Sequence, residues 1–164
     1  MDKLTLDKID DFLRGTAFLG TGGGGNPYVG GLMLRQELEK GFEPKLIKAD
    51  EVGDDDLILP IANMGAPTVL VEKLPNAKSA VKALRKMEEL MGKKAKALIA
   101  AEAGGINGTL PFIVSAYTGL PVIDADGMGR AFPELQMCTF GVYGVNCSPV
   151  IVRDEKDNEM VVDA

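Results

Sequence analysis

Apolar residues recur along the chain at spacings that predict helices and strands in alternation. Where they recur every three or four residues, with charged residues between them, we expect helices. These are expected at 4–14, from Pro27 to before Gly41, at 76–91 and at 110–117. Short continuous apolar runs bounded by Gly, Pro or Asp predict strands instead. Such runs lie at 16–19, 45–49, 57–62, 95–101 and 122–126.

The last third of the chain contains strand-like runs joined by turn signals. These runs cover 138–145, 149–153 and 159–162. Strands that alternate with helices favour a parallel sheet, whereas strands joined by short turns favour antiparallel pairing. We therefore expect an α/β fold of three layers, with a mostly parallel sheet and extra antiparallel strands at the C-terminus. Residues 1–164 are expected to form a single domain of this kind.

Composition and charge exclude several classes of protein. The formal net charge of −6 leaves no basic face for phosphates, so no nucleic-acid partner is expected. No apolar run approaches the ~20 residues that span a bilayer, and the acidic first residues do not resemble a signal peptide. The two cysteines, Cys138 and Cys147, match no disulfide scaffold or usual metal spacing. A cytoplasmic protein with no membrane partner is the expectation, and Cys138 is expected to pack as a small apolar residue.

The chain contains no histidine, which limits its chemistry. It cannot by itself supply a histidine-based triad, an imidazole proton shuttle or a histidine-rich zinc site. Any acid–base chemistry must therefore come from Asp, Glu, Lys, Tyr, Cys or water.

Glycine is abundant, at 20 residues, and it is clustered in three loops. Each loop is expected to follow a short apolar strand and to lead into a helix: 20–26, 102–107 and 124–130. In open α/β sheets, ligands bind at the carboxyl ends of the strands. The three loops are therefore expected to lie on one common rim and to bind a small polar substrate there.

The first loop carries four consecutive glycines, Gly22, Gly23, Gly24 and Gly25, followed by Asn26. Its exposed backbone N–H groups at a helix N-terminus would suit an anionic or carbonyl group of a ligand. Two alternatives stay open: a tight packing turn that needs positive φ, and a dinucleotide-binding loop with Asp50 as the acidic partner. A phosphate-binding loop of the P-loop type is excluded, because no Lys-Ser or Lys-Thr pair follows the glycines.

The third loop places Asp124 and Asp126 two residues apart, so a strand would direct both carboxylates to the same side. Such a pair suits general-base catalysis or a divalent metal ion. Arg130 and Glu134 are candidate substrate-binding residues, and Arg130 could instead bind one of these carboxylates. Glu134 lies four residues further on and would pair with Arg130 if a helix began at 131–132. The alternative is an ion-pair network that only fixes the loop.

The second loop offers Glu102 and Asn107. Glu102 ends an apolar strand, where an unpaired charge would be costly, so it is a candidate general base or cation ligand. Asn107 is a candidate substrate-binding residue. A carboxylate that only caps or bridges loops is the alternative for Glu102.

Three motifs together resemble those of a known family. They are TGGGGNPY (21–28), EAGGIN (102–107) and DADGMGRAFPELQM (124–137). The chain resembles the N-terminal domain of the S-methyl thiohydantoin desulfurase family, which is associated with hydantoinase-type enzymes. The resemblance implies hydrolysis of a hydantoin-like or thiohydantoin-like ring. It also implies that family members continue into a substantial C-terminal domain, so this sequence is expected to be an excised domain, a split subunit or a minimal relative.

These observations lead to one principal hypothesis and one alternative. The principal hypothesis is a hydrolase-type domain that acts on a small cyclic amide or thioamide, with Glu102, Asp124 and Asp126 as catalytic residues. It expects a homo-oligomer, or a partner subunit that supplies the missing C-terminal domain. The alternative is a non-catalytic ligand-binding or assembly subunit of a larger catabolic enzyme.

Overall fold

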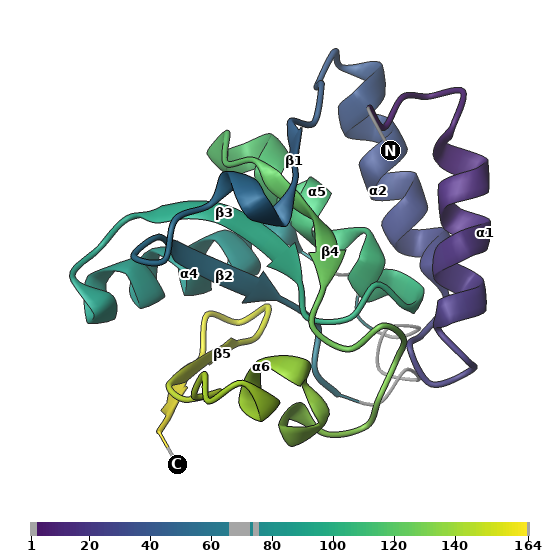
Figure 1. Cartoon of the computed structure of the whole chain (residues 1–164). Coiled ribbons are helices and arrows are strands. Elements are labelled where there is room, and N and C mark those ends of the chain that lie inside the picture. The colour runs from purple at the N-terminus through teal and green to yellow at the C-terminus, as the bar shows by residue number, and fades with distance from the viewer. Residues whose placement is uncertain (1–2, 66–72, 74–75, 164) are drawn as a thin grey trace.

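The structure is a computed structural model that describes residues 3–65, 73 and 76–163. Its centre is a four-stranded sheet in the order β1-β4-β3-β2, in which every described pair is parallel (Figure 1). The strands are β1 (Leu46–Ile47), β2 (Leu57–Ile61), β3 (Ala95–Ala100) and β4 (Val122–Asp126). The predicted α/β fold with a parallel sheet is therefore confirmed.

One face of the sheet carries the main core. The helices that cover it are α1 (Ile9–Leu19), α2 (Pro27–Glu39), α4 (Ala77–Met91) and α5 (Leu110–Thr118). Leu59, Leu98 and Val122 point into this core from three neighbouring strands. Asn26 accepts a hydrogen bond from the Tyr28 amide and so caps α2, as its sequence position before a proline predicts.

The opposite face of the sheet carries a smaller cluster and faces the viewer in Figure 1. Successive strand residues point to opposite faces, so Ala97 and Ile99 pack here while Leu98 packs in the main core. The cover consists of Val52, which follows the short helix η1 (Ala49–Glu51), and Phe140 of α6 (Thr139–Val142). Structure therefore lies on both faces of the sheet.

The C-terminal strands form a separate two-stranded antiparallel sheet, as expected. They are β5 (Val150–Arg153) and β6 (Glu159–Val162). This hairpin lies against α4, where the Ser79 hydroxyl donates to the Asp154 carbonyl at 3.0 Å. Lys82 of α4 also forms an ion pair with Asp157 in the turn of the hairpin.

Two strand predictions are wrong. Residues 16–19 belong to α1, because Ile9, Phe12 and Thr16 recur at helical spacing and pack as one continuous helical face. Residues 138–145 form α6 and turns after the short helix η3 (Leu135–Met137). Here three backbone amides, those of Gly141, Tyr143 and Gly144, donate hydrogen bonds to carbonyls three residues earlier. These amides therefore find their acceptors within the segment and not on a neighbouring strand.

Candidate functional site

The carboxyl ends of β2, β3 and β4 meet at one edge of the sheet. Ile61 lies opposite Ala100 in the β2–β3 register, and Ala100 lies opposite Asp126 in the β3–β4 register. The residues that follow these positions, Asn63 and Glu102, therefore share an edge with Asp126. We call this edge the rim, and it brings together the second and third glycine loops as the sequence predicts.

Glu102 is buried at the rim, with 8% of its surface exposed. Its Oε1 accepts a hydrogen bond from Asn107 Nδ2 at 2.8 Å, and its Oε2 accepts one from the Phe132 amide at 3.1 Å. The Oδ1 of Asn107 in turn accepts a hydrogen bond from the Asn63 amide at 2.7 Å. One carboxylate and one amide thus connect the loops that follow β2, β3 and β4. This arrangement matches the alternative given for Glu102, in which the carboxylate bridges loops.

Asp126 also holds its own loop in place. Its Oδ2 accepts a hydrogen bond from the Ala103 amide at 2.7 Å, and both its oxygens lie 3.0 Å from the Gly129 amide. Asp124 lies two residues earlier on β4 and is exposed. Within the described residues, no cluster of three or more Cys, Asp and Glu side chains could hold a metal ion.

The first glycine loop follows a helix, yet it still reaches the rim, because its backbone packs directly on the second loop. The Ile106 amide donates to the Gly24 carbonyl at 3.1 Å. Gly105 has a φ of +61°, and a Cβ there would lie 1.8 Å from the Gly24 oxygen. A Cβ on Gly104 would lie 2.6 Å from the Leu19 carbonyl oxygen. These glycines therefore allow two backbones to touch, as the packing-turn alternative requires.

The other residues of the first loop are arranged differently. Gly22 and Gly23 are exposed, and a Cβ on either would meet nothing within 4 Å. Gly25 is half-buried, with a φ of +76°, and Asn26 is committed to capping α2. Gly22 and Gly23 thus present their backbone to solvent.

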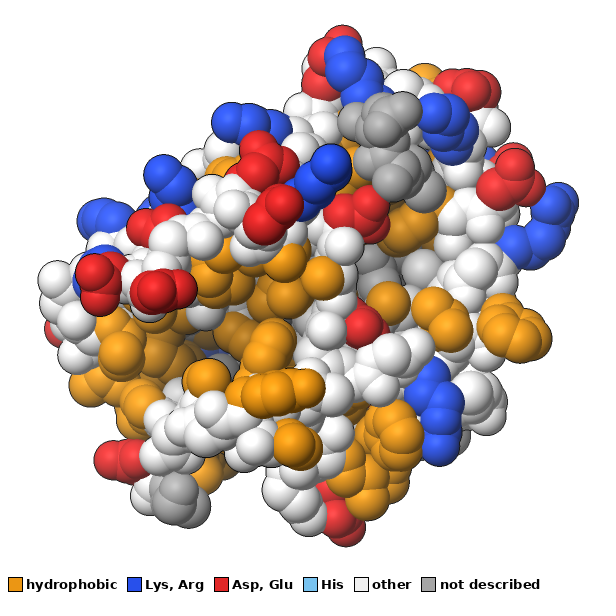
Figure 2. Space-filling view, viewed as in Figure 1, with side chains coloured by type: hydrophobic (Ala, Val, Ile, Leu, Met, Phe, Trp, Pro, Cys, Tyr) orange, Lys and Arg blue, Asp and Glu red, His pale blue; other side chains and the backbone are white. Residues whose placement is uncertain are grey.

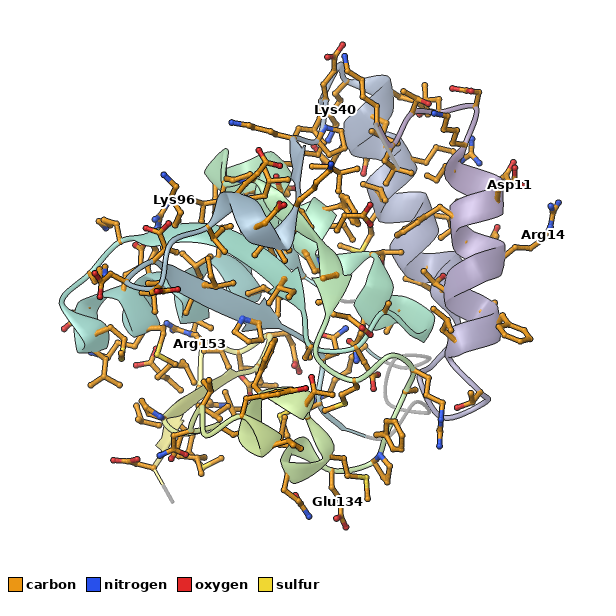
Figure 3. All side chains as sticks on the ribbon, in the orientation of Figure 1. Asp11, Arg14, Lys40, Lys96, Glu134 and Arg153 are labelled. Carbon is orange, nitrogen blue, oxygen red and sulfur yellow. The ribbon has the colours of Figure 1, made fainter. Side chains whose placement is uncertain are left out.

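Arg130 and Glu134 do not form the pair that a helix at 131–132 would allow. Residues 131–134 are not helical, and the guanidinium of Arg130 lies 3.9 Å from the centre of the Phe132 ring. Arg130 Nη1 also donates to the Ala131 carbonyl at 2.9 Å. Glu134 accepts a hydrogen bond from Gln136 and points outward at the lower edge of the molecule (Figure 3). Of the two, only Arg130 stays next to the rim network.

Sequence reasoning missed Asn63. The signal was available, because Asn63 is the first polar side chain after the predicted strand 57–62, and the carboxyl ends of parallel strands share an edge. The prediction for Cys138 is confirmed: this residue is buried, and its Sγ lies 3.3 Å from the Gly127 carbonyl oxygen.

Comparison with known proteins identifies the family of the chain and a solved structure with a similar fold. Residues 7–164 match the family described as S-Me-THD-like, N-terminal domain. This chain belongs to that family. It is also similar to an X-ray crystal structure of a protein from Chromobacterium violaceum, a Northeast Structural Genomics Consortium target, with 29% identity and a TM-score of 0.80. That similarity covers 99% of this chain and 44% of the other, so the chain spans less than half the length of this relative.

No curated protein matches the chain. None of the helices in the described residues is both long enough and apolar enough to cross a membrane.

Proposed function

We propose that this chain is the N-terminal domain of an enzyme that hydrolyses a small cyclic amide or thioamide of the hydantoin or thiohydantoin type. The observation that carries the proposal is the rim, where polar groups from three strand ends form one connected network beside the exposed backbone of Gly22 and Gly23. Membership in the S-Me-THD-like family supports the ring substrate. A second domain would form the opposite wall of the active site.

Hydrolysis of a ring carbonyl or thiocarbonyl needs a base to activate water and donors that stabilise the developing anion. Asp124 is exposed on β4 beside the network, and Asp126 is partly exposed, so these two carboxylates are the proposed water-activating groups. Glu102 is buried, unlike these two aspartates, and its hydrogen bonds with Asn107 and the Phe132 amide would hold the loops in register. The Gly22 amide and Arg130 are the proposed donors to the substrate, because the Gly23 amide already donates to the Gly20 carbonyl at 2.9 Å.

The test compares aspartate-to-asparagine variants in the enzyme assembled with its second domain. Asp124→Asn and Asp126→Asn should each lower kcat by at least about 100-fold, the typical contribution of a general base, as measured by loss of ring absorbance. Asp11→Asn provides a matched control, because Asp11 is an exposed acid on α1 that points away from the rim (Figure 3). Asp126→Asn could also loosen its loop, so the melting temperature of each variant is measured in parallel.

Retained turnover in both rim variants would contradict the proposal. If the assembled protein turns over no such ring but still binds one, the chain acts as a non-catalytic binding subunit.

A further inference from the structure

The segment after the rim has an unusual composition. No charged residue occurs between Glu134 and Arg153, although 26% of the chain is charged. Several apolar side chains of this segment are also strongly exposed: Val142 at 80%, Tyr143 at 86% and Val145 at 58%. Loss of charge together with exposed aromatic and aliphatic side chains is typical of the centre of a protein–protein interface.

The strand β6 extends this apolar surface. Met160, Val161 and Val162 are 57%, 44% and 38% exposed. Val162 pairs with Val150, and both line an open surface depression of about 670 Å³ together with Val145. Six exposed residues of 142–145 and β6 together form what we call the C-terminal apolar surface: Val142, Tyr143, Val145, Met160, Val161 and Val162. Figure 2 shows hydrophobic side chains gathered over this lower part of the molecule.

The hairpin is incomplete as a sheet. Its described part has only two strands, so one edge of β6 lacks a strand partner there. A two-stranded sheet is marginally stable alone, and an apolar edge strand tends to be covered or paired in the functional protein. Packing on α4 supports β5, whereas every residue of β6 remains exposed.

The comparison with the solved relative indicates what covers this surface. This chain matches 44% of that relative, and the family is that of an N-terminal domain. In longer members, the remaining polypeptide therefore follows the strand that corresponds to β6. We propose that the C-terminal apolar surface is the docking site for the C-terminal domain of the longer family members. The proposal rests on family membership, and it extends the proposed function by locating the second wall of the active site.

Helix α6, which ends at Val142 of the C-terminal apolar surface, is hydrogen-bonded to the rim at its first residue. The Thr139 amide and hydroxyl both donate to the Gly127 carbonyl, at 2.7 and 2.8 Å. The Gly127 amide donates to the Ala100 and Ala101 carbonyls at the end of β3. A domain docked on this surface would therefore contact, at its 142–145 end, the helix that is hydrogen-bonded to the loop carrying Asp126 and Arg130.

The first experiment measures amide hydrogen exchange in this chain and in the intact Chromobacterium violaceum protein. Residues 142–147 and β6 should exchange at least about tenfold more slowly in the relative, where the second domain is present, because docking removes the local openings that permit exchange. The buried strand β3 should exchange slowly in both proteins and serves as the internal control. Equal exchange of β6 and 142–147 in the two proteins would overturn the proposal.

The second experiment co-expresses this chain with a tagged polypeptide. That polypeptide contains the part of the Chromobacterium violaceum protein to which this chain is not similar. Tyr143→Asp and Val145→Asp should weaken co-purification at least tenfold, because each places a charge in an apolar interface. Tyr117→Asp is the matched control, since Tyr117 is 52% exposed but lies on α5. Binding that all three variants retain, or a wild-type homodimer that Tyr143→Asp dissociates, would show a different interface and overturn the proposal.

The two proposals fail in different ways. Asp124→Asn should reduce turnover without changing co-purification, whereas Tyr143→Asp should reduce co-purification. If the aspartate variants keep full turnover, the proposed function is wrong. If Tyr143→Asp keeps full co-purification, the docking proposal is wrong.

Discussion

Glu88 offers the strongest test of how the fold is held together. Its side chain is almost fully buried at the junction of α4 and β3, with 4% of the residue exposed. One oxygen accepts hydrogen bonds from Arg85 at 2.8 Å and Lys94 at 2.9 Å, and the other accepts one from the Ala95 amide at 2.9 Å. Burial by itself would raise the pKa of this carboxyl, but these interactions outweigh it and lower the pKa from 4.5 to about 2.

The lowered pKa sets the expected size and pH dependence of the effect. A shift from 4.5 to about 2 corresponds to about 3 kcal/mol of stability that only the ionised carboxylate supplies. Because the folded-state pKa is the lower one, this contribution is complete above pH 4.5 and disappears as the pH falls through about 2. With a pKa of 4.5 in the unfolded chain and about 2 in the folded one, about 1.4 kcal/mol of this stabilisation remains at pH 3.

The substitution Glu88→Gln removes the charge but keeps the shape of the protonated side chain. We expect it to lower the free energy of unfolding by about 3 kcal/mol at pH 7, measured by urea denaturation followed by circular dichroism. The difference from wild type should shrink steadily between pH 5 and pH 2.5. Glu89→Gln is the matched control: Glu89 pairs with Lys86 at 3.1 Å, but its side chain is 71% exposed, so a change below about 0.5 kcal/mol is expected.

Two results would refute this reasoning. The first is a cost at pH 7 that does not exceed that of Glu89→Gln. The second is a difference between wild type and Glu88→Gln that stays constant as the pH falls.

Two further substitutions test the packing of the rim and of the sheet. Gly105→Ala should cost at least about 3 kcal/mol, because its Cβ would overlap the Gly24 oxygen at 1.8 Å. Gly119→Ala, also at positive φ but with open space, should cost only about 1 kcal/mol; similar melting temperatures for the two variants would argue against the backbone contact. Leu98→Ala should lower stability by about 3 kcal/mol by opening a cavity in the main core, whereas exposed Lys96→Ala on the same strand should change the urea midpoint little.

Much of the candidate site could be predicted from the sequence. Strand ends in a parallel sheet share an edge, so the positions of Glu102 and Asp126 follow from the order of apolar runs and glycine loops. The sequence did not, however, predict what each of these carboxylates does in the folded protein. Whether Glu102 faces a ligand or the Phe132 amide depends on a loop that returns 30 residues later, and no local pattern encodes that contact.

The first glycine loop shows the same division. Its sequence required tight turns, but it did not show that Gly24 would lie against Gly105 while Gly22 and Gly23 face solvent. The misassigned strand at 16–19 has a related cause. Four apolar or small residues suit either a strand or the last turn of a helix, and only the shared burial of Ile9 and Thr16 decides between them.

The sequence by itself determined the elements whose signals are local. Asn26 before Pro27 set the start of α2, helical spacing set α4, and short apolar runs set the four parallel strands. Only the tertiary structure decided which backbones touch, which carboxylates hold loops, and that 142–145 and β6 remain exposed together. The physical reason is that local signals act through neighbouring residues in the chain, whereas close packing and hydrogen-bond satisfaction depend on residues that only folding brings together.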